Sequence, residues 1–335
     1  MKKYLVTVGI DVSKSKLDVR FVFEPANTEH PHIIVANNEK GIKGIISFLK
    51  KQKIQPDDAL FCFENTGLYS MPLSIYFSKQ QLDYWEIPAV EIKRSKGISR
   101  GKNDKVDAKD IAFYAVTHGH KLKLSQIPEQ DILKLQLLYS EREKLLKAIH
   151  AMEASVEATN FLSKEVTNEV MAINKKTVAQ LKVSLKKIDA AIIVIVKSNK
   201  QLEDCFQLAT SVPGVGKQSA IYLIIKTRCF TRFKNWRKLA CYAGIAPFEY
   251  SSGSSIKGKT KVSHVADKKM KSLLNMAALS AKKYDKEISD YYVRKINEGK
   301  NPMLVMNAIR CKILSRVFAV INRQTPFVNT QKFAA

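Results

Sequence analysis

Short runs of apolar residues in the first 120 positions predict strands, and longer stretches with helical spacing separate them. The strand-like runs are rich in β-branched and aromatic residues and cover 4–12, 17–23, 32–36, 59–63 and 84–87. The helix-like stretches cover 41–51, 72–80 and 105–117. The predicted order is therefore β-β-β-α-β-α-β-α, opening with a three-stranded meander. This order is the one used by the ribonuclease H fold, a mixed sheet flanked by helices, so we expect such an α/β domain over residues 1–125.

Residues 129–212 form a stretch of 84 consecutive positions without Gly or Pro, so nothing in its composition interrupts a helix. Two sets of apolar residues follow the 4-3 spacing of a coiled-coil seam: Leu145, Ile149, Met152 and Val156, then Leu181, Leu185, Ile188, Ile192 and Ile195. We expect a long, coiled-coil-like pair of helices over 126–205. The pattern fits both an antiparallel pair packed on its own chain and a pair used for oligomerisation.

The last segment, 206–335, opens with a helix, a tight Pro-Gly-x-Gly turn and a second helix, which together form a helix-hairpin-helix signature. We expect this segment to be mainly helical. Gly214 and Gly216 let the backbone approach a phosphate, whose charge Lys217 and the first amides of the second helix can meet. A plain helical turn is the alternative interpretation of the same residues.

Composition sharpens this picture. The chain has 335 residues, 45% of them apolar, with 56 Lys and Arg against 31 Asp and Glu, a net charge of +25. The charge is +4 over 1–120, +3 over 121–212 and +18 over 213–335. A general basic bias, useful only for solubility, would spread over all three segments. The concentration therefore predicts that the C-terminal segment binds nucleic acid.

Several classes of protein are excluded by what the sequence lacks. No run of 18 apolar residues is present, and the N-terminal residues enter a strand-like run without a small-residue cleavage site, so we expect neither a membrane span nor a secretory signal. Five cysteines lie singly without a C-x-x-C pair: Cys62, Cys205, Cys229, Cys241 and Cys311. This spacing indicates reduced thiols in a cytoplasm and argues against a disulfide framework or a cysteine-type zinc site.

Carboxylates end two of the predicted strands. Asp11 closes one apolar strand and Glu64 another, and such a group is costly to bury unless a metal or a donor compensates it. Asp104 and Asp107 share a face at the start of the 105–117 helix, which we expect to pack beside the two strand ends. Four carboxylates without His or Cys suit Mg²⁺ or Mn²⁺, and two such ions promote phosphoryl transfer. Acids at a helix start also suit the helix dipole, which is the alternative for the second pair.

A second interpretation exists for the strand end at Asp11. The turn from Gly9 to Ser13 also resembles the first phosphate loop of actin-like sugar kinases and ATPases. Those proteins need further Gly-rich phosphate loops, and the first 200 residues contain none.

A hydroxyl-rich turn, Ser-Ser-Gly-Ser-Ser at 251–255, precedes three lysines at alternating positions, Lys257, Lys259 and Lys261. A serine beside Gly253 can be presented on an open turn as a nucleophile, and the lysines can offset charge on the attacked phosphorus. Taken alone, such a stretch is more often a flexible loop.

Together these motifs resemble the DEDD transposases of the insertion sequence 110 family, whose members are serine recombinases guided by a structured bridge RNA. The resemblance covers nearly the whole chain, with the motifs in this order: Gly9-Ile10-Asp11-Val12-Ser13 and Leu17-Asp18; Glu64-Asn65-Thr66-Gly67-Leu68-Tyr69; Asn103-Asp104-Lys105-Val106-Asp107-Ala108; the helical middle; Pro213-Gly214-Val215-Gly216; and Gly244-Ile245-Ala246-Pro247 to Ser251-Ser252-Gly253.

The resemblance assigns the four metal-binding acids of a RuvC-like domain to Asp11, Glu64, Asp104 and Asp107. It assigns the nucleophile to Ser252, with Ser251 as the fallback. It implies that Mg²⁺ assists the serine in attacking DNA phosphodiesters, which gives a covalent phosphoserine and a free 3′ hydroxyl before religation. The implied partners are DNA, a structured guide RNA and further copies of the chain, as a dimer or tetramer, at the nucleoid of a bacterial or archaeal cytoplasm.

The sequence departs from the family pattern after the serine loop. Where members tend to have Gly before Leu-Arg, this chain has Ala266 or Asp267, and then Lys271 in place of Arg. These departures affect a tight turn and the bidentate phosphate contact that only Arg can make.

Two other classes of function fit part of the pattern. A metal-dependent nuclease or junction resolvase would use the same acids with water as nucleophile and would form no covalent protein–DNA species. A non-enzymatic basic protein would bind nucleic acid in a strongly salt-dependent way and would cut nothing.

Overall fold

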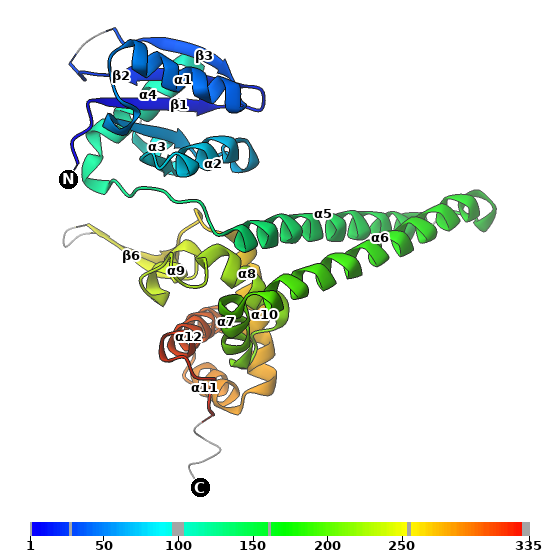
Figure 1. Cartoon of the computed structure of the whole chain (residues 1–335). Helices are drawn as coiled ribbons and strands as arrows, with labels where there is room; N and C mark the ends of the chain where they lie inside the picture. Colours follow the sequence, from blue (N-terminus) through cyan, green and yellow to red (C-terminus); the bar gives the residue numbers. More distant parts are fainter. Residues whose placement is uncertain (1, 27–28, 96–103, 160–161, 253–255, 330–335) are drawn as a thin grey trace. The chain divides into compact units, whose positions relative to one another are not determined.

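The structure is a computed structural model that describes residues 2–26, 29–95, 104–159, 162–252 and 256–329 (Figure 1). The chain divides into two compact units, Met1–Ile127 and Pro128–Ala335. Across the described residues, no helix is both long and apolar enough to cross a lipid bilayer.

A five-stranded mixed sheet of order β3-β2-β1-β4-β5 forms the centre of the first unit. Its strands are β1 (Val6–Val12), β2 (Lys16–Val22), β3 (His32–Ala36), β4 (Ala59–Glu64) and β5 (Tyr84–Ile87). The first three strands pair antiparallel as the predicted meander, while β4 runs parallel to both β1 and β5. All five predicted strands are confirmed, and the mixed sheet with its helices is consistent with a ribonuclease H-like domain.

The described part of this unit contains the α-helices α1 (Glu39–Lys51), α2 (Met71–Lys79), α3 (Ala89–Ser95) and α4 (Asp104–Thr117). The Asn38 side chain starts α1 by accepting a hydrogen bond from the Gly41 amide at 2.9 Å. The sequence predicted α1, α2 and α4. Helix α3 was not predicted; it is a short helix that begins directly after Pro88.

The strands send alternate side chains to two cores, one on each face of the sheet. On one face, Val8 and Ile10 of β1 are buried in a cluster that includes residues of α1 and α2. On the other face, Leu60 and Cys62 of β4 are buried in a cluster with residues of α4. Gly9 faces α4 so closely that an added Cβ would lie 2.2 Å from the Ala108 carbonyl oxygen. Helix α4 therefore packs directly on the backbone of β1.

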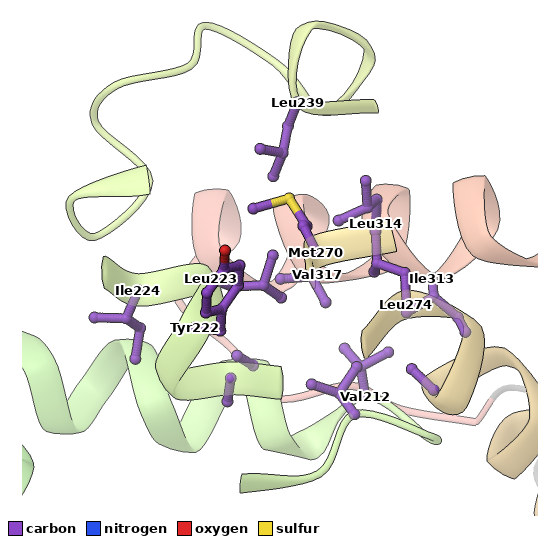
Figure 2. Packing of buried hydrophobic residues seen from close by; sticks show 14 of the residues in the cluster. Val212, Tyr222, Leu223, Ile224, Leu239, Met270, Leu274, Ile313, Leu314 and Val317 are labelled. Carbon is purple, nitrogen blue, oxygen red and sulfur yellow. The ribbon is translucent and has the colours of Figure 1, made fainter. Parts of the chain in front are cut away.

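The second unit is mainly helical, with one two-stranded hairpin. It contains α5 (Gln130–Thr159), α6 (Lys164–Ser198), α7 (Lys200–Ser211), α8 (Lys217–Thr227), α9 (Trp236–Tyr242), β6 (Pro247–Ser252), β7 (Ile256–Val262), α10 (Lys268–Tyr284), α11 (Lys286–Asn297) and α12 (Pro302–Arg323). Figure 2 shows part of its core, where Leu239 of α9, Met270 of α10 and Val317 of α12 gather. Leu135 of α5 and Ile192 of α6 are buried in the same cluster, which anchors one end of the long helices.

Helices α5 and α6 pack along each other as a long antiparallel pair (Figure 1). Ile149 and Ile192 of the predicted seams are buried, while Leu145, Leu181 and Leu185 are half-buried. Helix α7 is the helix expected just before the Pro-Gly-x-Gly turn, but the break that separates it from α6 was not expected, because no Gly or Pro lies there. The break occurs at Asn199, whose side chain accepts hydrogen bonds from the Gln201 and Leu202 amides at 3.1 and 3.3 Å and so caps α7.

The close contact at Gly9 predicts that Gly9→Ala destabilises the first unit. The new methyl group meets backbone atoms of α4, which cannot rotate away, so we expect a loss of about 1–3 kcal/mol in the free energy of unfolding. Urea unfolding of the full chain, followed by Trp85 fluorescence in a Trp236→Phe background, measures it, since Trp85 packs on Tyr114 of α4 with ring centroids 5.7 Å apart.

Gly119→Ala is the matched control, because nothing lies within 4 Å of a Cβ built there. Equal stability of the Gly9→Ala and Gly119→Ala proteins would show that α4 can move off β1 without cost.

Candidate active site and nucleic-acid interface

Asp11 and Glu64 lie at the same edge of the sheet. Strands β1 and β4 are parallel, and their register pairs Ile10 with Phe63, so the next residue on each strand is one of the two acids. Glu64 is two residues beyond Cys62, which packs towards α4, and Asp11 is two residues beyond Gly9, which does the same. Strand alternation therefore directs both half-buried carboxylates to the α4 face.

The start of α4 lies at this carboxyl edge as well. The chain after α4 returns to the opposite edge, because the Ser125 amide donates to the carbonyl of Tyr84, the first residue of β5, at 2.8 Å. Helix α4 thus runs antiparallel to β1, and Asp107 directly precedes the residue that touches Gly9. Asp104 is the first residue of α4, and its side chain lies outside the described part of the structure.

Asp18 is a further acid at this edge that the site prediction did not include. It lies opposite Asp11 in the β1–β2 register, so both point to the same face, and it is buried, with 4% of its surface exposed. Its carboxylate lies 3.0 Å from the Lys16 ammonium and 3.1 Å from His32 Nε2. The signal in the sequence was a lone acid between the apolar residues of β2.

Loops around the acids are tied together by one amide. The Asn37 Nδ2 donates to the carbonyl of Ser13, just after β1, and to that of Tyr69, just after the β4 loop, at 2.9 Å each. This arrangement holds the turns that follow Asp11 and Glu64. The loops that follow the two strand ends are therefore linked to each other through the Asn37 side chain.

The donor set fits a hard divalent cation, because every acid assigned to the site offers carboxylate oxygens. Among the side chains that the structure describes, no three of Asp, Glu, His and Cys lie close enough to hold a metal ion. Asp104, the fourth acid, is not among those side chains. The structure thus brings three of the four acid positions to one edge of the sheet.

The Pro-Gly-x-Gly turn joins α7 to α8, and its two glycines have different surroundings. Gly214 has φ +90°, and a Cβ there would lie 2.3 Å from the Ala277 carbonyl oxygen of α10. Gly216 has nothing within 4 Å of a built Cβ, and it precedes Lys217, which is exposed at the start of α8. Packing on α10 explains Gly214, while Gly216 and Lys217 are exposed.

The predicted serine loop is the end of the β6–β7 hairpin. The antiparallel register pairs Ser252 with Ile256, Ser251 with Lys257 and Phe248 with Lys261, and it shifts between Phe248 and Tyr250. The hairpin therefore places Lys-rich β7 alongside the strand that ends in Ser252. The side chains of the two serines and of Lys257, Lys259 and Lys261 lie outside the described part.

The base of the hairpin is held tightly. Gly244 has φ +65°, and a Cβ on it would lie 2.4 Å from the Ala266 Cβ, so the chain entering the hairpin touches the chain leaving it. The Asp267 amide donates to the Tyr242 carbonyl at 2.9 Å. From α12, the Asn307 Nδ2 donates to the Ile245 carbonyl at 2.6 Å.

Asp267, one of the departures from the family pattern, starts α10. Its Oδ1 accepts a hydrogen bond from the Met270 amide at 2.9 Å, so Asp267 is the N-cap of α10. The Tyr222 hydroxyl donates to the same carboxylate at 2.9 Å. Burial, and then the charge of Asp267, raise the pKa of Tyr222, which keeps the hydroxyl protonated as a donor.

Polar contacts also join the long helices to α8 and α10. The Arg142 Nε of α5 donates to Asp189 of α6 at 2.7 Å, and the Gln218 Nε2 of α8 donates to the same carboxylate at 3.1 Å. Lys269 of α10 lies 2.6 Å from Glu143 of α5. The first turns of α8 and α10 are therefore fixed to the base of the α5–α6 pair.

Comparisons with known proteins agree with these motifs. The DEDD transposase model of the IS110 family, described as "Transposase", matches residues 8–159, and the model described as "Transposase IS116/IS110/IS902 family" matches residues 206–293. A pilin gene-inverting protein of Moraxella bovis is 24% identical over 324 residues, which cover 96% of this chain and 97% of that protein. The protein of the same description from Moraxella lacunata shares the same identity and coverage.

A further relative matches a shorter region. The insertion element IS110 uncharacterized 43.6 kDa protein of Streptomyces coelicolor is 30% identical over 116 residues, 35% of this chain and 28% of that protein.

The contacts of Asp267 predict that Asp267→Ala and Tyr222→Phe are coupled in stability. Loss of the cap costs about 1 kcal/mol, and a buried hydroxyl left without an acceptor costs about 1–3 kcal/mol more. Tyr222→Phe should therefore cost less in the Asp267→Ala background than in the wild type, with a coupling of about 1–2 kcal/mol in thermal or urea unfolding.

Asn301→Ala provides the control, because Asn301 caps α12 by accepting from the Met303 amide at 2.9 Å and has no tyrosine partner among the contacts that the structure describes. The Tyr222 contribution should persist below pH ~10, where an unfolded tyrosine keeps its proton, and should fall at higher pH. Additive losses for Asp267→Ala and Tyr222→Phe would contradict the contact.

Proposed function

Because the chain belongs to the IS110 family of DEDD transposases, we propose that this DNA recombinase cuts and rejoins DNA through a covalent bond to Ser252. The observation that carries the proposal is the hairpin whose first strand ends at Ser252, held at its base by Gly244 and Asp267 in a segment with a charge of +18. A nucleophile needs a supported position and a nearby cationic surface to receive a phosphodiester.

The proposed step balances as a simple phosphoryl transfer. The Ser252 Oγ loses its proton and bonds to phosphorus, the bond from phosphorus to the 3′ oxygen breaks, and that oxygen leaves with a proton as a free 3′ hydroxyl. The reverse reaction with a different 3′ hydroxyl rejoins the strands. The phosphoserine bond keeps the energy of the phosphodiester, so no external energy source is needed.

The relatives support rejoining rather than simple cutting. Their description as gene-inverting proteins refers to a reaction in which a DNA segment is reversed and both its ends are joined again. A nuclease that uses water leaves ends that are no longer activated. The first alternative, a metal nuclease or junction resolvase, is therefore less well supported, and the non-enzymatic alternative conflicts with the family.

Four acids would hold the divalent metal ions that DEDD transposase domains generally use: Asp11, Glu64, Asp104 and Asp107. Bound Mg²⁺, or Mn²⁺, would supply charge stabilisation to the attacked phosphodiester. The chain itself contributes the parallel register of β1 and β4, the contact of α4 with Gly9 and the Asn37 hydrogen bonds. These contacts fix the backbone at the strand ends and at the start of α4, on which the proposed ligands lie.

Assembly with further copies of the chain, as a dimer or tetramer, is supported by α6. Val166, Val170 and Ile173 are exposed by 67%, 49% and 58% and recur at helical spacing of 4 and 3. An exposed apolar stripe on a long helix suits a second helix as partner. Such assembly would bring acids and serines of different copies together, as the family resemblance implies.

The family resemblance and the charge of the C-terminal segment both support guidance by an RNA. If base pairing with a structured RNA selects the target, protein residues need only bind backbones, and Gly216, Lys217 and the β7 lysines are suited to that role. Activity of the copurified protein–RNA material should then be lost on ribonuclease treatment. We place this recombinase at the bacterial or archaeal nucleoid.

The serine mechanism predicts a protein–DNA adduct that survives denaturant. Wild-type protein with its copurified RNA, Mg²⁺ and DNA carrying an element end should form it, visible as a shifted band on a denaturing gel. Ser252→Ala should abolish the adduct because the nucleophilic oxygen is gone. Ser251→Ala is the matched control and should still form it; an adduct in the Ser252→Ala protein, or cleavage without any adduct, would refute the assignment.

The acid assignment predicts that Asp11→Asn and Glu64→Gln each lower strand exchange by at least ~100-fold, the order of loss when a group that stabilises a transition state is removed. Both changes are nearly isosteric, so the sheet should remain intact. Asp57→Asn, at the exposed turn before β4 and hence at the opposite end of that strand, should leave the rate unchanged. Quantification of recombined product over time distinguishes these outcomes, and full activity of Asp11→Asn would exclude the metal site.

A further inference from the structure

Residues 226–242, between the last turn of α8 and the serine hairpin, form an unusually basic and aromatic segment. It contains six cations and four aromatic rings and no acid: Lys226, Arg228, Arg232, Lys234, Arg237 and Lys238, with Phe230, Phe233, Trp236 and Tyr242. Neither the helix-hairpin-helix motif nor the serine loop includes these residues. We call this segment, which includes the end of α8 and the whole of α9, the cation–aromatic loop.

The backbone of the loop is held in one uncommon conformation. Arg228, Cys229 and Phe230 are three consecutive residues with positive φ, at 50°, 51° and 64°. The Thr227 Oγ1 accepts a hydrogen bond from the Phe230 amide at 2.9 Å, and the Phe230 ring packs edge-on against Phe318 with centroids 5.4 Å apart. Such a turn persists only where its surroundings enforce it, so the loop is rigidly attached to the core.

Two guanidinium groups lie over aromatic rings of this loop. Arg232 is 5.5 Å from the centroid of Phe233 and 5.6 Å from that of Tyr242, and Arg237 is 5.0 Å from that of Trp236. The rings are half-buried against the core, whereas both arginines are exposed. A stacked guanidinium keeps its edge N–H groups for phosphates and presents its outer face to a base.

The exposed cations of the loop have no anionic partner in the described structure. No carboxylate there forms an ion pair with Arg232, Lys234, Arg237 or Lys238. Other cations of the same unit are paired, as Lys312 is with Glu287 at 2.5 Å. An external polyanion is therefore the natural counterpart of the loop.

The loop is joined to the base of the serine hairpin through Tyr242. The Phe233 and Tyr242 rings lie 5.3 Å apart, and the Tyr242 carbonyl accepts a hydrogen bond from the Asp267 amide. From this geometry we propose that the cation–aromatic loop binds single-stranded DNA at the base of the serine hairpin, whose first strand ends at Ser252. Phosphates contact Lys234, Arg237 and Lys238, and unstacked bases stack on the layers formed by Arg237 with Trp236 and by Arg232 with its two rings.

Single-stranded DNA is the occupant that this surface fits best. Stacking on side chains needs bases that are free of their neighbours, and strand exchange beside Ser252 produces such bases in DNA. The inference thus rests on the proposed function of the hairpin for the identity of the strand. The binding surface itself rests only on the loop.

The test measures equilibrium binding by fluorescence anisotropy at several KCl concentrations, with one short mixed sequence as single-stranded DNA, as duplex DNA and as single-stranded RNA. Trp236→Leu should weaken single-stranded DNA binding roughly 5- to 150-fold, the range for one stacked base, with an unchanged salt dependence. Arg237→Gln/Lys238→Gln should instead lower the log–log salt slope by about 1.4, since each lost phosphate contact on a single strand removes roughly 0.7.

Two control variants distinguish a specific loss of binding from a loss of folding or of net charge. Trp236→Phe keeps an aromatic ring and should retain most of the affinity. Lys175→Gln/Lys176→Gln changes the net charge equally on the exposed surface of α6 and should leave affinity and slope unchanged. Wild-type affinity of the Trp236→Leu protein, or a loss confined to RNA or to duplex DNA, would overturn the proposal.

The same measurements in the Ser252→Ala protein separate the two proposals. Binding needs no cleavage, so the cation–aromatic loop can be tested whether or not Ser252 forms an adduct. A normal adduct with unaltered binding by the loop variants would refute this inference alone.

Discussion

Close contact between the backbones of α4 and β1 at Gly9 is the constraint on which the acidic site depends. A side chain at that position would push the helix away by the width of a methyl group, because its nearest neighbours are main-chain atoms of α4. Only with this contact does Asp107, one residue from it, approach the edge where Asp11 and Glu64 end their strands. A residue with no functional group thus determines how closely α4, and with it Asp107, approaches the strand ends.

The second unit also relies on close contacts at glycines, here to hold the turns near its cationic surfaces. Gly244 lets the two chains at the base of the hairpin touch, and Gly214 lets the α7–α8 turn rest on α10. Around these contacts, Asp267 combines a helix cap, a tyrosine acceptor and a link to the preceding turn. The cationic surfaces are therefore carried by a core whose loops have little freedom, which suits the binding of a charged strand without a large ordering cost.

Much of the first unit followed from the sequence because its strands alternate clearly and short turns separate them; β3 and β5 agree with the prediction in both bounds. The predictions failed where one polar side chain decides the outcome. Asn199 ends α6 by capping α7, although the stretch lacks Gly and Pro. For the site, the sequence predicted that Asp11 and Glu64 lie together at neighbouring strand ends. It did not predict the buried Asp18, because the contacts of this carboxylate with Lys16 and His32 belong to no metal-binding motif.

The fixed base of the hairpin has a mechanical consequence. Hydrogen bonds from α12 and from the start of α10, and the crossing at Gly244, all act within a few residues of Pro247, where β6 begins. A strand of DNA attached at Ser252 would pull on the β6–β7 hairpin, whose base is bonded to α10 and α12. If DNA is attached at Ser252 as proposed, force on the DNA would reach α10 and α12 through these contacts.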